Sequence, residues 1–197
     1  MQPAKINYKI YQGSTFQETF RWESETKVYV PISAIAKSAP CIVTTTTPHN
    51  LPIGWRFRVV GAGGMKEINS TSEEYHLSTL IPTTTTVEIN QVNSLAYTAY
   101  TSGGVIEFNQ PVSLAGYAAR MQIRETVDST TIIHEATTQN TQISLDNTTK
   151  TIQITLLANV TQAFTFSTAV YSLELYNGNN VIPFIYGNLT LVQEVTR

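Results

Sequence analysis

The stretch that decides the fold is AARMQIRE, residues 118–125. Met121 and Ile123 alternate with Arg120, Gln122 and Arg124, so one set points to a core and the other away from it. This period of two predicts a β-strand with one buried face. The polar set, Arg120, Gln122 and Arg124, is a candidate surface for docking a partner subunit. The alternative for these three residues is a solvated polar face.

The same period extends outward in both directions. Phe16, Glu18 and Phe20 share one face of an early strand, and Val28–Val30 reads as a strand that Pro31 stops. Further strands are expected at 6–10, 132–136, 142–145, 151–157, 169–175, 181–186 and 188–195, with one short helix at 158–164. Asn and Gly at 177–180 predict a hairpin turn before a strand that Pro183 marks as edge or bulged.

The middle of the chain reads differently. Shorter strands are expected at 42–46, 56–60, 75–80, 85–90 and 104–108, separated by Pro- and Gly-rich turns. The phrase Pro-Ile-Ser at 31–33 is echoed by Pro-Val-Ser at 111–113, which suggests one domain interrupted by another. We therefore predict an all-β fold: an antiparallel β-sandwich of residues 1–35 plus 109–197. A small β-barrel or sandwich, residues 36–108, is inserted in one of its loops.

Composition narrows the function classes. Charged residues make up 13% of the chain, and the formal net charge is −2. No basic stripe supports nucleic-acid binding, and no apolar run approaches a membrane span of about 20 residues. The N-terminal residues do not form a signal-peptide core, so synthesis in a cytoplasm is expected. The low charge suggests that part of the surface is covered by partner proteins.

Several phrases of the predicted sandwich resemble a known family. They are Gly13-Ser14-Thr15-Phe16, residues 111–117 (PVSLAGY) leading into 119–124 (ARMQIR), residues 187–191 (GNLTL) and Val195-Thr196-Arg197. Together they resemble the N-terminal module of tailed-bacteriophage baseplate and tail proteins. Ser113 and Ala115 depart from that pattern, which commonly has Asp and Thr there.

The predicted insert resembles a small β-module found in phage virion proteins. The matching phrases are 43–45 (VTT), 48–51 (PHNL) with Gly54, 64–69 (GMKEIN) and 100–104 (YTSGG). Asn50 and Trp55 depart from the common Gly and Asp. The two resemblances imply a virion structural protein of the tail or baseplate, without catalysis. It would link tail to fibre or receptor-binding proteins, as a homo-oligomer in a symmetric ring.

Residues that carry chemistry are sparse. His49, His76 and His134 lie far apart, and the single cysteine, Cys41, rules out an intramolecular disulfide, so no metal or other cofactor is expected. Glu18 is the one acid placed on an apolar strand face. We expect it to lie near a strand end or to pair with Arg21, Arg120 or Arg124 rather than to catalyse a reaction.

Other functions stay open at this point. Trp55, Tyr97 and Tyr100 form a candidate stacking surface for sugar rings, which would make the chain a carbohydrate-binding module at a tail tip. A head decoration or head–tail connector protein would have a similar sequence. The threonine runs 44–47 and 83–86 are candidate edge strands for pairing with a neighbouring subunit.

Overall fold

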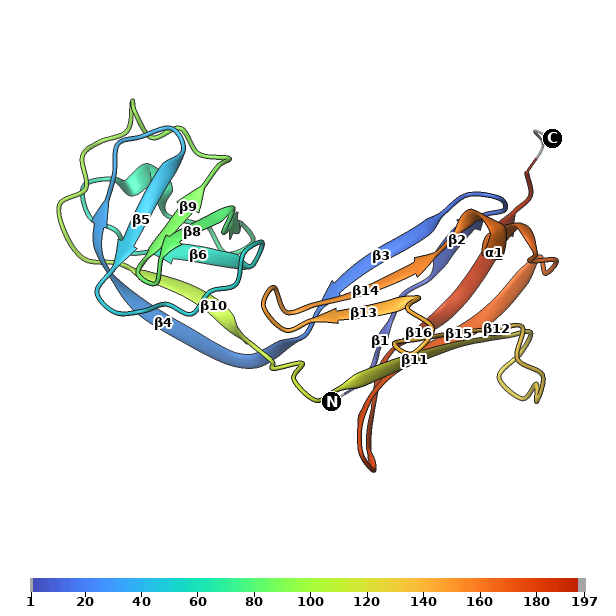
Figure 1. The fold of residues 1–197 in the computed structure, drawn as a ribbon. Coiled ribbons are helices and arrows are strands. Elements are labelled where there is room, and N and C mark those ends of the chain that lie inside the picture. Colours follow the sequence, from blue (N-terminus) through green and yellow to red (C-terminus); the bar gives the residue numbers. More distant parts are fainter. Residues whose placement is uncertain (1, 195–197) are drawn as a thin grey trace. The chain divides into compact units, whose positions relative to one another are not determined.

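The computed structural model describes residues 2–194. The chain folds into two compact units (Figure 1). The split unit comprises residues 1–21, 113–147 and 151–197, and the inserted unit comprises 22–112 with 148–150. The boundaries differ from the expected 35/36 and 108/109. Residues 23–35 form the long strand β4 (Glu23–Ile35), whose partners β10 (Val105–Pro111) and β5 (Cys41–Thr45) belong to the inserted unit. The phrase at 195–197 lies outside the described residues.

The split unit contains a six-stranded sheet with the order β1-β16-β15-β11-β12, in which β2 also pairs with β16. Its strands are β1 (Ala4–Lys5), β2 (Tyr8–Tyr11), β11 (Ala118–Arg124), β12 (His134–Thr137), β15 (Thr168–Asn177) and β16 (Asn180–Val192). The hairpin turn between β15 and β16 lies where the sequence predicted it, with Gly178 at φ +57°. The two short N-terminal strands run parallel to β16.

A second, three-stranded sheet completes the split unit. Its order is β13 (Ile143–Asp146), β14 (Thr151–Leu156) and β3 (Phe16–Arg21). The helix α1 (Ala158–Gln162) is one short segment within the predicted 158–164. Alternate residues of both sheets are buried, including Ile123, Leu173 and Ile152. This is the predicted all-β sandwich architecture, with 50% of the chain in strands and 4% in helix.

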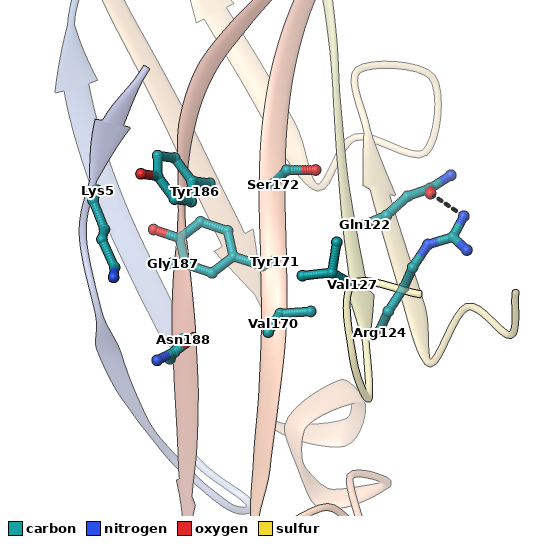
Figure 2. A pocket seen from close by; sticks show the side chains of 10 residues that line it. All are labelled: Lys5, Gln122, Arg124, Val127, Val170, Tyr171, Ser172, Tyr186, Gly187 and Asn188. Atoms are coloured by element: carbon teal, nitrogen blue, oxygen red, sulfur yellow. Dashed lines mark hydrogen bonds between the residues drawn. The ribbon is translucent and has the colours of Figure 1, made fainter. Parts of the chain in front are cut away.

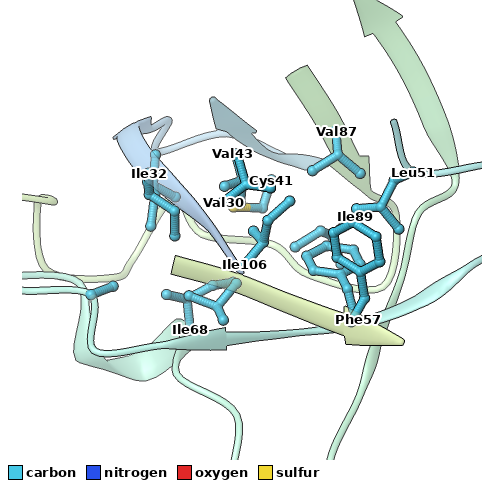
Figure 3. Packing of buried hydrophobic residues seen from close by; sticks show 14 of the residues in the cluster. Val30, Ile32, Cys41, Val43, Leu51, Phe57, Ile68, Val87, Ile89 and Ile106 are labelled. Carbon is cyan, nitrogen blue, oxygen red and sulfur yellow. The ribbon is translucent and has the colours of Figure 1, made fainter. Parts of the chain in front are cut away.

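The inserted unit is a seven-stranded sheet with the order β7-β6-β10-β4-β5-β9-β8. Its remaining elements are β6 (Arg56–Val60), β7 (His76–Leu77), β8 (Leu80–Thr83), β9 (Thr86–Ile89) and the short 3₁₀ helix η1 (Lys66–Ile68). Figure 3 shows its apolar core, where Val43, Phe57 and Ile106 meet from three strands. The first threonine run does not form an edge, because β5 lies between β4 and β9; Thr83, by contrast, ends the edge strand β8.

Candidate functional site: the outer face of the six-stranded sheet

The alternation that predicted β11 also predicted its exposed face. Ala119, Met121 and Ile123 are buried, while Arg120 is exposed and Gln122 and Arg124 are half-buried. The polar set therefore lies on the face of the sheet that points away from the apolar core. We call this surface the outer face.

Strand pairing brings residues from distant parts of the chain into one row on the outer face. Gln122 pairs with Ser172 on β15, Ser172 with Tyr186 on β16, and Tyr186 with Lys5 on β1. On the other side, the Gln122 side-chain amide donates to Glu135 Oε1 on β12 at 2.6 Å. The row thus runs across all the strands of the path from β1 to β12.

A hollow of about 460 Å³ lies over this row (Figure 2). The residues that line it include two cations, several polar groups and apolar side chains. They are Lys5, Gln122, Arg124, Val127, Val170, Tyr171, Ser172, Tyr186, Gly187 and Asn188. No Asp or Glu belongs to this set. Because the cations have no carboxylate beside them in the lining, the hollow favours an anionic group on its occupant.

Arg124 is held in place by two hydrogen bonds. It donates through Nη1 to the Ser129 carbonyl at 2.5 Å and through Nη2 to Gln122 Oε1 at 2.8 Å, the second drawn in Figure 2. The first bond ties the strand to the loop 125–133, which brings Val127 to the hollow with 82% of its surface exposed. Both acceptors are neutral, so the guanidinium keeps its full charge for a partner.

Arg120 has a different role from Arg124. Its guanidinium donates to Glu174 Oε2 at 2.8 Å and lies over the Tyr176 ring, 5.8 Å from the centroid. The hydrogen bond to Glu174 raises the pKa of Arg120 further above its ordinary value. Arg120, Gln122, Ser172 and Glu174 line a smaller polar hollow of about 240 Å³. The charge of Arg120 is thus already compensated, and Arg124 with Lys5 supplies the free positive charge.

Trp55 does not belong to an exposed sugar-binding surface of the inserted unit. Trp55 is 0% exposed, and its indole N–H donates to the Asn109 carbonyl at 2.9 Å. Tyr100 is half-buried with its hydroxyl 2.9 Å from the Gly103 carbonyl, and Tyr97 packs partly buried against the core. A tryptophan without exposed surface has no face to offer a sugar ring, so Trp55 is a core residue.

The histidines occupy separate places. His49 is 2% exposed and accepts a hydrogen bond from the Leu51 N–H at Nδ1, so Nε2 carries the proton and faces the Thr86 carbonyl at 3.3 Å. Burial lowers the pKa of His49, and this neutral tautomer satisfies both ring nitrogens. Between residues 2 and 194, no three His, Cys, Asp or Glu side chains are grouped as a metal site requires.

Sequence reasoning found the β11 part of the outer face and missed the rest. Lys5, Tyr186 and Val127 join the hollow only through strand pairing and a loop, which no local pattern reports. No protein-family model matches the chain, and no curated protein matches it. Within the described part of the chain, no helix has the length and apolar character needed to cross a membrane.

Proposed function

We propose that this chain is a non-enzymatic structural adaptor in the tail or baseplate of a tailed bacteriophage. It would bind a neighbouring virion protein through the outer face of the six-stranded sheet. The observation that carries the proposal is the hollow over that face, where two cations flank exposed apolar groups and no carboxylate lines the walls. The resemblance to phage tail proteins supports a place in the virion, and one of the segments that carry it, residues 119–124, lies in β11.

The geometry suits a protein surface better than a small substrate. Figure 2 shows Lys5 and Arg124 on opposite sides of the hollow, with Val170 and Val127 between them. Tyr186 adds a half-exposed aromatic ring, and tyrosine and arginine are enriched in protein interfaces. Exposed apolar groups between fixed cations match a partner surface with apolar side chains and a carboxylate. Placement in a symmetric ring of copies is part of the same proposal.

Cross-linking of assembled particles tests the proposal. Lys5 carries a primary amine at the hollow, whereas Lys66 is an exposed lysine of the inserted unit and serves as an internal control. We expect an amine-reactive linker to join Lys5 to a different virion protein within purified particles. Arg124→Gln should reduce incorporation of the chain into particles, and Glu125→Gln, at an exposed neighbouring position, should not. Absence of the chain from particles would refute the virion role.

The sugar-binding alternative has lost its main residue, because Trp55 is buried. Loss of glycan binding in Trp55→Ala would not support that alternative either, since the substitution removes the centre of the apolar core. The outer face carries the stronger physical argument for an interaction between proteins.

A further inference from the structure

The other sheet of the split unit ends in an open edge, the strand β3. The three-stranded sheet has the order β13-β14-β3, so β3 pairs on one side only. It is six residues long, Phe16–Arg21, and is paired with β14 over its full length. Such an edge leaves a row of backbone donors and acceptors for another strand.

The register shows which backbone groups are unpaired. Thr155 donates its N–H to the Gln142 carbonyl, so Thr155, Gln153 and Thr151 use their backbone groups toward β13. The alternate residues of β14, at 152, 154 and 156, therefore face β3 and bond to Phe20, Glu18 and Phe16. It follows that the N–H and C=O groups of residues 17, 19 and 21 point to the open edge. Within residues 2–194 they have no backbone or side-chain partner.

The side chains beside this edge are also incompletely covered. Phe16, Glu18 and Phe20 point inward, yet all three remain half-exposed. They meet Tyr8 of β2, whose ring centroid lies 5.4 Å from that of Phe16 and 6.5 Å from that of Phe20, in edge-to-face geometry. We call Phe16, Glu18 and Phe20 the aromatic row. It is packed against Tyr8 on one side and exposed to solvent on the other, so one more strand would cover it.

Glu18 lies in the middle of the aromatic row. The expectation that it lies near a strand end or pairs with arginine is wrong, because it is central in β3 and forms no ion pair within the described residues. Arg120 is occupied by Glu174, and Arg124 by Gln122 and Ser129. The carboxylate acts on its neighbours: burial and the Glu18 charge raise the pKa of Tyr8 to about 12. A half-buried carboxylate without a counterion favours a cationic partner.

We propose that the β3 edge binds an extended segment of another protein by strand addition, with a Lys or Arg of that segment facing Glu18. Apolar residues two positions before and after the basic residue would cover Phe16 and Phe20, because side chains alternate along a strand. A second copy of β3 paired in the register centred on Glu18 is disfavoured as the occupant. Antiparallel pairing of two copies about Glu18 would place two carboxylates on the same face, and like charges directly opposite are destabilising.

The experiment separates binding from a simpler role of the same carboxylate. An inward-pointing charge on an edge strand protects a protein from self-association. If the Glu18 charge serves only to prevent strand pairing, neither a basic nor an acidic strand will bind at the edge. If it also distinguishes strands by their charge, a basic strand will bind and an acidic one will not.

The test uses the full chain and short synthetic peptides. The probe is the capped peptide Thr-Val-Thr-Lys-Thr-Val-Thr, and its partner peptide has Glu in place of Lys. NMR titration up to millimolar peptide follows the backbone amides of Gln17, Thr19 and Arg21. We expect the Lys peptide to shift these amides and slow their hydrogen exchange. The Glu peptide should bind about fivefold more weakly or worse, the factor that a cross-strand charge pair supplies.

Two controls make the result specific. N-methylation of the central threonines of the Lys peptide removes its edge N–H groups and should abolish the shifts without altering the protein. Glu18→Gln should remove the discrimination between the two peptides, whereas Glu125→Gln should preserve it. Three outcomes overturn the proposal: no shifts at millimolar peptide, shifts that survive N-methylation, or protection of residues 17–21 that depends on protein concentration alone.

Discussion

Trp55 gives the sharpest test of the two-unit organisation. Its side chain is 0% exposed in the core of the inserted unit, and its N–H bond to Asn109 joins β10 to the start of β6. Truncation of a buried tryptophan to alanine costs about 3–5 kcal/mol. For a unit of 60–100 residues, each kcal/mol lowers the melting temperature by about 4–8 °C. Trp55→Ala should therefore lower the melting temperature of the inserted unit by at least about 12 °C.

The assay is hydrogen exchange measured separately for the two units. We expect faster exchange across β6 and β10 in Trp55→Ala, with exchange across β15 and β16 unchanged. Leu173→Ala, at a fully buried position of the split unit, should give the reverse pattern. Trp55→Phe keeps an aromatic ring and leaves the Asn109 carbonyl without its donor, at a cost of about 1–3 kcal/mol. Equal acceleration of exchange in both units, or none, would refute the reasoning.

Three further predictions follow from single contacts. His49 is buried and neutral with a lowered pKa, so its imidazole binds a proton more readily in the unfolded chain than in the folded one. The stability that the neutral ring contributes should be full above about pH 6.5 and should fall at lower pH. In His49→Gln the urea midpoint of unfolding should therefore fall less steeply as the pH is lowered. Gly187→Ala should release residues 4–7 from β16, because a Cβ would collide with the Ile6 carbonyl oxygen, and proteolysis near the N-terminus should report it. Gly178→Ala strains the turn between β15 and β16, where φ is +57°, but its Cβ meets no neighbouring atom, so residues 4–7 should stay paired. Asn140→Ala should promote self-association seen by light scattering, because Asn140 caps the Thr137 N–H at 2.8 Å and the Glu135 carbonyl at 2.9 Å on the edge of β12.

The alternation and turn residues in the sequence predicted the features that depend on neighbouring residues. The alternation at 118–124 identified both faces of β11, and the Asn-Gly turn identified the hairpin of β15 and β16. Pro183 was predicted to be edge or bulged, and it lies at a register shift opposite Glu174 in a strand that is interior to the sheet. The bulge accommodates a proline where a regular ladder would lose a hydrogen bond.

Pro31 was misread for a related reason. It was expected to stop the strand, yet β4 continues to Ile35. The Pro31 carbonyl accepts from the Thr46 N–H, so the proline nitrogen also faces the side of β5, just beyond Thr45 where that strand ends. No ladder bond is lost there, so the strand passes through the proline and the domain boundary moves to residue 22.

Pairings between distant residues could not be predicted. Trp55 was placed on a candidate sugar-stacking surface, but its hydrogen-bond partner Asn109 is 54 residues away, and no local pattern reports that contact. The threonine run 44–47 suggested an edge, but β5 pairs with β4 on one side and with β9 on the other. Lys5 joined the outer face through parallel pairing with β16, and sequence alternation contains no information about which strand is the neighbour.

The two sheets of the split unit treat their open edges differently, and this contrast bears on how the protein associates. On β12 a single side chain, Asn140, satisfies one donor and one acceptor that would otherwise face solvent, so that edge offers fewer backbone groups to an added strand. On β3 no side chain among the described residues caps the edge, and the inward Glu18 distinguishes strands by charge instead. A cap weakens pairing with every strand, whereas a charge weakens pairing with some strands only. An edge of six residues that accepts a basic strand is therefore a means of specific association, and the hollow of the outer face, lined by two cations and no carboxylate, suits the opposite charge.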